Sequence, residues 1–566
     1  MVPQDKSLLL LCGDTERNLA RYSSIACLSP ARRLRLEQRG VQTALFSDFG
    51  PDEVAGAILD INLFKHLDEA LHAEAVGNPL LKWAPLCYLA VQFRLSRYLW
   101  LKHSLRNLLS KSGVSSMCLS SAGDSDLTSA ITAVCLERNC KLEIGDDPID
   151  QITSTQYKVR FYGLPRSCDP VWLVKLRWRL WALLHDRRAW AVQPYWNLEP
   201  PGEQFFQLKV FSAINLFGRA KEKILQYFGF RLFSRISDQS LELCTPRQMI
   251  LHSPEWEKRF SEDEIRLVNM VVESFASEYP ADLLERMALN LEVVLQEIGV
   301  LNVILMNDRL DACRLLAFVA RRCGVKSHYL PHGLILEDYS GSLSTSPFRP
   351  DRMLAWNQPS RHAFETQGWP SVSVAHPQFA LQPERFRGLH KAPDEIRVLV
   401  LTSDWVCFSQ AGREDCTVVD LYETCRGLLA FGIRPSNINA KFHSTNEDIN
   451  RAKERGLGQL KDATGMEFEI VRSEKRTTAL IPDYDLIIMG LTSGIFEAVM
   501  AGVPLVIVGK SSLRVGGIQS FGLPVAHNGE ELTLLLMKYN NQQQEDAFQA
   551  LAESLRSGPS LSAACS

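Results

Sequence analysis

The sequence predicts an α/β fold made of two doubly wound parallel sheets, with a mostly helical insertion in the N-terminal half. Three observations lead to this fold class. Short apolar runs alternate with helix-length segments near the N-terminus and again after residue 300. The stretch between the two series is rich in helical periodicity and poor in strand signals. With 566 residues, of which 46% are hydrophobic, the chain can bury more than one core.

The N-terminal half is expected to begin with strands at 8–12 and 41–46, separated by a basic helix face at 32–39 and followed by helix over 54–111. One β-α-β unit then comprises 116–120, 127–139 and 141–144, and a similar one comprises 302–306, 311–323 and 328–330. Both units fit neighbouring crossovers of one parallel sheet. Between them, 155–295 is predicted as a mostly helical insertion.

A new domain is predicted to begin after the polar stretch 382–394, which holds two prolines. Its strands are expected at 396–401, 438–442, 468–471, 486–489 and 505–508, separated by helical lengths. The expected division is therefore an N-terminal α/β domain in two parts, 1–154 and 296–381, the helical insertion 155–295, and a C-terminal doubly wound domain at 395–555.

Small and hydroxyl residues stand where one C-terminal strand ends and a helix begins. The turn 490–494 follows the strand 486–489 and precedes a short helix. Thr492 and Ser493 would cap that helix beside free backbone N–H groups, which suit a phosphate oxygen. Glu497, about one turn further on, can reach a pair of ribose hydroxyls. The alternative is that Ser493 is only an N-cap and Glu497 only an acid favoured by the helix dipole.

A second strand end carries cationic groups. Strand 438–442 brings Lys441 and His443 to the carboxyl edge of the same sheet, with Ser444 beside them. That edge is where open parallel sheets bind phosphate and sugar, so the two motifs together indicate a nucleotide-linked ligand. Thr402, after the first strand of this domain, could also touch such a ligand, although a turn explains it more simply.

The motifs of this domain follow the order strand, Lys-x-His, strand, Thr-Ser-Gly, helix with Glu, and Gly-x-Pro. This order resembles the donor half of GT-B glycosyltransferases, nearest to bacterial sialyltransferase, polysialyltransferase and capsule-polysaccharide families. The resemblance implies two Rossmann-type domains that face a cleft and a nucleotide-sugar donor. It implies donor contacts from Lys441, His443, Ser444, Thr492, Ser493, Gly494 and Glu497. This sequence has His443-Ser444 where those families have His-Pro, and Thr492-Ser493 where they have Ser-Ser or Ser-Thr.

A second resemblance lies upstream. Residues 327–333, 351–356, 368–370 and 372–377 are similar to the strand, His-Gly loop, strand, Trp, Gly-x-Pro, strand layout of surface-polysaccharide and teichoic-acid polymerases with a GT-B core. The resemblance implies that His332 faces the interdomain cleft and contacts the acceptor or the donor. The alternative is a histidine that only hydrogen-bonds a turn.

Two places compete for the base that an inverting transfer would need. One is the acidic strand end at 143–147, with Asp146 and Asp147, which resembles an acidic motif of bacterial sialyltransferases in altered order. The other is His332. Because a run of acids after a strand is more often an ordinary loop, Asp146 and Asp147 rank level with His332.

Composition argues against several classes of protein. A net charge of −3 gives no sign of nucleic-acid binding. The 14 cysteines form no Cys-x-x-Cys pair and no Cys/His cluster, so neither a zinc site nor a disulfide framework is expected, and no other cofactor is predicted. The apolar run at 8–12 is too short for a signal peptide, which favours a cytoplasmic protein.

Residues 171–190 mix tryptophans with cations, a pattern typical of helices at a membrane interface. No stretch of the sequence is long and apolar enough to span a bilayer. The alternative is a core helix with snorkelling arginines. The interfacial alternative predicts peripheral contact with the inner face of the cytoplasmic membrane, where a glycolipid acceptor would be met.

The expected function is transfer of a sugar from a nucleotide sugar, with a CMP-sugar favoured over a UDP-sugar, to a glycan or glycolipid acceptor such as lipopolysaccharide or capsule. No metal is expected to take part. Donor binding is expected to close the cleft across the stretch 382–394. Three alternatives stay open: a CDP-polyol phosphotransferase of the teichoic-acid type, a non-hydrolysing sugar-nucleotide epimerase, and an inactive GT-B scaffold.

Overall fold

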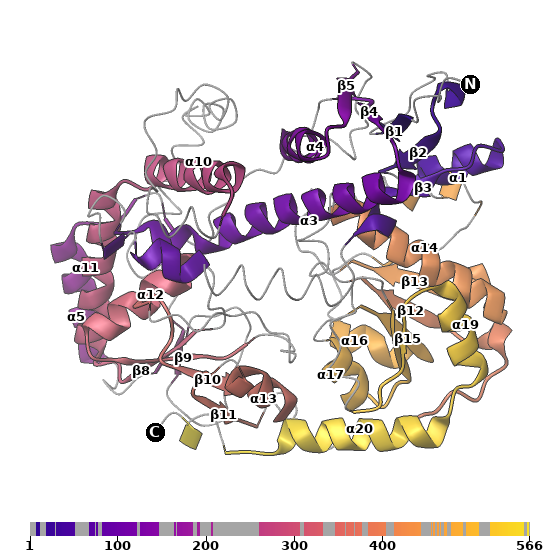
Figure 1. Cartoon of the computed structure of the whole chain (residues 1–566). Helices are drawn as coiled ribbons and strands as arrows, with labels where there is room; N and C mark the ends of the chain where they lie inside the picture. The colour runs from indigo at the N-terminus through magenta and orange to yellow at the C-terminus, as the bar shows by residue number, and fades with distance from the viewer. Residues whose placement is uncertain are drawn as a thin grey trace, which may run out of the picture. The chain divides into compact units, whose positions relative to one another are not determined.

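The structure is a computed structural model of the chain (Figure 1). It describes residues 7–11, 19–28, 30–50, 67–73, 75–76, 82–121, 125–145, 164–165, 167–184, 190–192, 205–207, 260–305, 311–331, 346–356, 358–366, 368–375, 383–402, 413–442, 454, 457–458, 461–462, 465, 469–471, 477–490, 494–508, 521–559 and 563–564. The chain divides into two compact units. One consists of Met1–Asp60, Ser96–Lys158 and Leu381–Leu555, and the other of Ile61–Leu95, Val159–Ala380 and Arg556–Ser566.

The first unit contains a sheet of N-terminal residues. Its strands are β1 (Ser7–Leu11), β2 (Ser24–Cys27), β3 (Ala44–Leu45), β4 (Ser116–Leu119) and β5 (Lys141–Ile144). They pair in parallel in the order β3-β2-β1-β4-β5, with α1 (Pro30–Gln38) connecting β2 to β3 and α4 (Ser125–Glu137) connecting β4 to β5. Leucines Leu8 to Leu11 of β1 are buried, as expected for the central strand of a sheet covered on both faces.

The helix predicted over 54–111 is observed at 67–73, at 75–76 and from residue 88 onward. Helix α3 (Tyr88–Ser112) follows a short 3-10 turn at Ala84–Cys87, and residues 51–66 lie outside the described part of the chain. Arg97 of α3 forms a buried ion pair with Asp126 of α4, with 3.0 Å between the nitrogen and the oxygen. This pair ties α3 to the helix that follows β4.

The first unit also contains the C-terminal sheet. Its strands are β12 (Val398–Leu401), β13 (Ile438–Lys441), β14 (Glu469–Ile470), β15 (Leu486–Met489), β16 (Leu505–Val508) and β17 (Val525–Ala526). They pair in parallel in the order β14-β13-β12-β15-β16-β17, which is the order of a Rossmann sheet. The accompanying helices are α14 (Arg413–Phe431), α16 (Thr477–Leu480), α17 (Gly494–Met500), α19 (Gly529–Met537) and α20 (Asn541–Arg556). The five strands predicted for this domain are present, and β17 is an additional edge strand.

The polar stretch predicted as an interdomain linker packs onto the C-terminal domain from residue 383 onward. The Arg387 N–H donates to the carbonyl oxygen of Gly502 at 2.9 Å. Gly502 has a φ of +62°, and a Cβ at this position would collide with the carbonyl oxygen of Arg385. The ring of Phe386 packs edge-on against Phe548, with 4.9 Å between centroids. These residues therefore belong to the C-terminal domain instead of forming a free linker.

The second unit contains a third sheet. Its strands are β6 (Trp190–Val192), β7 (Phe205–Gln207), β8 (Asn302–Leu305), β9 (Lys326–Tyr329), β10 (Arg352–Ala355) and β11 (Ser371–Ser373). They pair in parallel in the order β11-β10-β9-β8-β6-β7. The helices of this unit include α5 (Val171–Leu184), α10 (Glu262–Glu278), α11 (Ala281–Ile298), α12 (Asp311–Arg322) and α13 (Gln358–Thr366).

The strand pairing differs from the sequence prediction in two respects. The two predicted β-α-β units do not share a sheet, because β4 and β5 belong with β1 whereas β8 and β9 belong with β6 and β10. The insertion predicted as mostly helical also contributes β6 and β7 to the third sheet. Apolar runs predict strands but not their partners, since pairing depends on residues remote in sequence. The α/β class is confirmed, and the described strands form three parallel sheets in place of the two expected.

An ionic cluster lies in the interior of the second unit. Asp68 accepts hydrogen bonds from Arg349, at 2.9 Å, and from Arg314, and the three side chains are at most 1% exposed. The ring centroid of Tyr88 lies 4.8 Å from the Arg314 guanidinium and 5.4 Å from that of Arg349. Burial favours the protonated form of Asp68, but the two guanidinium groups outweigh this effect and lower the pKa of the carboxyl. The cluster joins α12 to the segments before α3 and β10.

Candidate functional site

The strand order of the C-terminal sheet creates a topological switch point (Figure 1). From β12 the chain continues to β13 and β14 on one side, and from β15 it continues to β16 and β17 on the other. The connections that leave the carboxyl ends of β12 and β15 therefore diverge, and open α/β sheets bind their ligands at this point. The candidate site accordingly lies at the carboxyl ends of β12, β13 and β15.

Two buried residues at this edge are joined to each other. Thr402, directly after β12, donates its N–H to the carbonyl oxygen of Lys441 at 3.1 Å, and its Oγ1 lies 3.4 Å from the same oxygen. Both side chains are 7% exposed. The sequence predicts a simple turn at Thr402, whereas its contact with Lys441, 39 residues later, depends on the pairing of β12 with β13.

The electrostatics of Lys441 set it apart from a solvated lysine. Its pKa is lowered because burial disfavours the ammonium form, while the carboxylate of Glu497 opposes that shift. An ammonium group with few water neighbours gains more from pairing with an anion than a fully hydrated one does. The edge is therefore suited to a ligand that carries a phosphate.

Helix α17 brings Glu497 to this edge. The four residues of β15 are buried, and α17 begins at Gly494, so that Glu497 lies in its first turn. Gly502, in the left-handed conformation, follows the last turn, where such a residue commonly ends a helix. The strand and the helix predicted from the sequence are therefore observed at this position, while residues 491–493 of the predicted turn lie outside the described residues.

The structure describes Lys441, Gly494 and Glu497 among the predicted donor contacts and places them at the carboxyl edge of one sheet. The remaining predicted contacts, His443, Ser444, Thr492 and Ser493, lie outside the described residues, as do the catalytic candidates His332, Asp146 and Asp147.

The described neighbours of the catalytic candidates lie at strand ends. Pro331, just before His332, is buried, and its carbonyl oxygen accepts a hydrogen bond from the indole N–H of Trp356 at the end of β10. Glu143, before Asp146, is exposed on β5 and pairs with Lys141 at 2.9 Å. Each candidate therefore follows the carboxyl end of a parallel strand, β9 for His332 and β5 for the two aspartates.

Comparison with known proteins gives only distant matches. No family model matches this chain. No curated protein matches it either.

Several solved structures are similar to part of the chain. MnaA of S. aureus, in a structure with UDP, is 13% identical over 49% of this chain and 74% of that chain, with a TM-score of 0.33. The spinosyn rhamnosyltransferase SpnG, complexed with spinosyn aglycone, is 12% identical over 55% of this chain and 83% of that chain, with a TM-score of 0.30. A UDP-GlcNAc 2-epimerase from Neisseria meningitidis, bound to UDP-GlcNAc, is 11% identical over 50% of this chain and 88% of that chain, with a TM-score of 0.31.

Proposed function

We propose that the chain is a glycosyltransferase of the GT-B type, which transfers a sugar from a nucleotide-sugar donor to a surface glycan such as lipopolysaccharide or capsule. The observation that carries this proposal is the buried Lys441 at the switch point of a Rossmann-ordered sheet, with Glu497 close enough to influence its pKa. Sheets of this order bind nucleotides at that edge. A cation there stabilises the leaving phosphate of such a donor, because this phosphate gains negative charge in the transition state.

In this proposal the C-terminal sheet holds the donor. The Lys441 ammonium pairs with a donor phosphate, and the Glu497 carboxylate accepts hydrogen bonds from the ribose hydroxyls. The contacts are completed by His443, Ser444, Thr492, Ser493 and the backbone of Gly494. A CMP-sugar is favoured, with a UDP-sugar as the second choice, because the motifs resemble those of sialyltransferases.

The chemical step needs a base if the reaction inverts the anomeric carbon. The base removes the proton of an acceptor hydroxyl, the hydroxyl oxygen bonds to the anomeric carbon, and the bond from that carbon to the phosphate oxygen breaks. The candidates for the base are His332 and the pair Asp146 and Asp147. No cofactor enters this step.

The proposal is tested by incubating the purified chain with CMP-, UDP- and GDP-sugars and following nucleotide release with and without a glycan acceptor. We expect acceptor-dependent release from one class of donor. Lys441→Met should lower kcat/KM for that donor by tenfold or more, about 1.4 kcal/mol or more for a lost charge-assisted contact. The matched control is Lys391→Met, because Lys391 is an exposed lysine of the same domain that pairs with Asp485.

The other functions give different results in the same assay. Conversion of a UDP-sugar without an acceptor would indicate an epimerase. Turnover of a CDP-polyol alone would indicate a phosphotransferase of the teichoic-acid type. Absence of binding to any nucleotide would indicate a scaffold, and each of these outcomes would contradict the proposed transfer.

Helix α5 supports the further proposal that the enzyme contacts a membrane surface. The face formed by Val174, Trp178 and Ala182 is at most 5% exposed, and the helix packs against α11. The opposite face is apolar but exposed: Trp172 is 67%, Leu176 50%, Leu180 53% and Leu183 67% exposed. A spacing of four, four and three residues places these side chains in one stripe along the helix.

Cations accompany this exposed stripe. Lys175 and Arg179 are exposed, and Arg179 pairs with Glu297 of α11 at 3.3 Å. An apolar stripe accompanied by cations suits an anionic bilayer surface, such as the inner face of the cytoplasmic membrane. Trp178 does not belong to the stripe, because it is buried beside Trp181, with 5.7 Å between ring centroids. Among the described helices, none is long and apolar enough to cross a bilayer.

Liposome co-sedimentation tests the membrane contact. The double variant Trp172→Ser with Leu176→Ser should bind vesicles of anionic lipid at least tenfold more weakly, since each buried apolar side chain contributes about 1.5–3 kcal/mol. The control is Leu534→Ser on α19, where an exposed leucine of another helix is removed. Equal sedimentation of the wild type and the double variant would refute the assignment of this face.

A further inference from the structure

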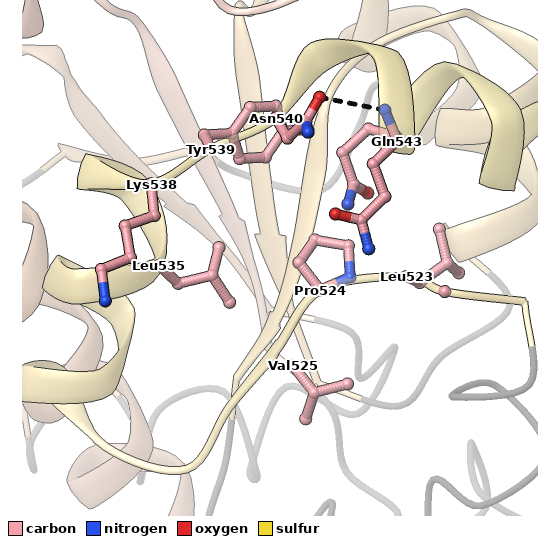
Figure 2. Close-up of a pocket in the computed structure, with 10 residues that line it drawn as sticks. Leu523, Pro524, Val525, Leu535, Lys538, Tyr539, Asn540 and Gln543 are labelled. Atoms are coloured by element: carbon pink, nitrogen blue, oxygen red, sulfur yellow. Dashed lines mark hydrogen bonds between the residues drawn. The ribbon is translucent and has the colours of Figure 1, made fainter.

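A pocket of about 410 Å³ opens at the amino edge of the C-terminal sheet (Figure 2). It lies between the start of β17, the end of α19 and the first turn of α20. Helix α19 begins after the carboxyl end of β17 and leads back to the opposite edge. The pocket is therefore at the edge of the sheet away from Lys441, and it is separate from the candidate donor site.

The lining of the pocket has an apolar and a polar part. Leu523, Pro524, Val525 and Leu535 supply apolar surface. The polar residues are Lys538, Tyr539, Asn540, Gln543 and Gln544, which offer carboxamides, a phenol and an ammonium group. No carboxylate occurs among these described lining residues. The lining therefore favours a neutral or anionic polar ligand over a cation.

Two of the polar groups in the lining are buried and have no hydrogen-bond partner among the described residues. Gln544 is 5% exposed, and its Oε1 atom is buried without a donor. The hydroxyl oxygen of Tyr539 is also buried without a partner. Asn540, in contrast, is occupied, because its Oδ1 accepts the N–H of Gln543 at 3.2 Å and caps α20 (Figure 2).

Unpaired buried polar atoms are rare in folded proteins and lower stability. Both atoms belong to residues that line the same pocket, so a ligand bound there is the source of the missing partners. Burial also raises the pKa of Tyr539, so its phenol keeps its proton and can both donate and accept. The ligand must therefore supply at least one donor to Gln544 Oε1 and a hydrogen-bonding group to the phenol.

From this lining we infer that the pocket binds a saccharide. A sugar ring combines apolar C–H faces with several hydroxyls, and each hydroxyl donates and accepts, which matches apolar walls beside two carboxamides and a phenol. Lys538 adds a cation for a sugar that carries a carboxylate. The volume lies within the range of about 300–1,000 Å³ that small-ligand pockets span.

The assignment of this saccharide to the acceptor or product glycan rests on the proposed glycosyl transfer. The inference that the pocket binds a saccharide rests only on its lining residues. Bound here, a segment of the glycan would be held on the donor domain, away from the edge where the donor binds. Such a second site would keep a growing glycan attached between transfers.

Saturation-transfer NMR on the full chain tests the pocket, with glucose, N-acetylglucosamine and glucuronic acid as probes. We expect at least one of the three to receive saturation from the wild type. Tyr539→Phe should weaken the affinity for that sugar by about tenfold, the ratio that corresponds to ~1.4 kcal/mol, and Lys538→Ala should weaken the affinity for glucuronic acid. Gln549→Ala, an exposed glutamine of α20 outside the lining, should leave the affinity unchanged.

A stability readout separates a ligand group from a structural one. Tyr539→Phe should melt no lower than the wild type in the absence of sugar, because its hydroxyl has no partner in the described part of the chain. A lower Tm, the same affinity in Tyr539→Phe and the wild type, or no transfer to any of the three sugars would overturn the inference. Lys441→Met should bind the probe sugar with the affinity of the wild type. A wrong assignment of the donor site can therefore be distinguished from a wrong assignment of this pocket.

Discussion

Asp68→Asn should destabilise the second unit more than the loss of an exposed ion pair in the same unit does. The carboxylate of Asp68 is fully buried and accepts hydrogen bonds from Arg314 and Arg349, which are themselves buried. Asp68→Asn keeps the shape of the side chain but removes the negative charge. Two guanidinium groups would then remain in the interior without their main counter-charge.

The size of the effect follows from the burial of the cluster. Removing one partner of a buried ion pair costs about 3–5 kcal/mol. Because Asp68 serves two arginines, we expect the loss to lie near the upper end of that range. Asp282→Asn is the control, since its ion pair with Arg286, at 3.3 Å, is exposed and its loss should cost no more than about 1 kcal/mol.

Urea unfolding followed by tryptophan fluorescence measures the difference. Trp369 reports directly on the cluster, because its ring centroid lies 5.7 Å from the Arg349 guanidinium. The variant Arg314→Met and the double variant with Asp68→Asn complete a mutant cycle, in which a coupling free energy above the experimental error is expected. If Asp68→Asn and Asp282→Asn unfold at the same urea concentration, the cluster does not stabilise the unit.

The same cluster predicts a dependence on pH. The pKa of Asp68 is lowered in the folded chain, so its contribution to stability is complete above its unfolded value of about 3.9 and is lost as the pH falls below it. Asp68→Asn should lack this part of the acid sensitivity, which urea midpoints between about pH 5 and pH 3 would show.

Two further predictions concern the C-terminal domain. Gly502→Ala should lower the free energy of unfolding by about 1–3 kcal/mol, through strain at positive φ and collision with the carbonyl oxygen of Arg385. Gly324→Ala is the control, because Gly324 also has a positive φ but lies in open space, and its substitution should cost less. Equal losses in the two variants would contradict the collision. The affinity for the nucleotide donor should fall as the pH rises toward the lowered pKa of Lys441, before the ordinary lysine value of 10.5 is reached. Lys441→Arg should remove that dependence in a pH titration of donor binding, and a dependence that survives the change would exclude Lys441 as its source.

Strands of the C-terminal domain could be predicted because their signal is local. The runs that form β12, β13, β15 and β16 are short, apolar and bounded by turn residues, so each can be located without knowledge of the rest of the chain. β17 has only two apolar residues between Pro524 and His527, too short a run for such a signal, whereas β14 lies within the longer run 468–471. The same limit explains why β6 and β7, with three residues each, were not predicted within the helical insertion.

Helix α5 illustrates what a pattern of residue types leaves open. Its tryptophans and leucines occupy more than one side of the helix, so the sequence predicts a helix without stating which side is buried. Packing against α11 covers Trp178 and leaves Trp172 exposed. Which side of α5 is buried depends on a partner helix about a hundred residues away in the sequence, so it cannot be predicted from the residues of α5 alone.

The candidate donor edge combines both kinds of information. The sequence by itself determined that a lysine stands at the end of an apolar strand and that a glutamate lies one turn into a helix after another strand, because both are local properties. Only the tertiary structure decided that these strands lie on either side of β12 at the switch point, that burial lowers the pKa of Lys441, and that Tyr539 and Gln544 line a pocket at the far edge. Strand order, burial and pocket lining arise from contacts between residues far apart in the chain, and their free energies depend on which groups replace water around each side chain.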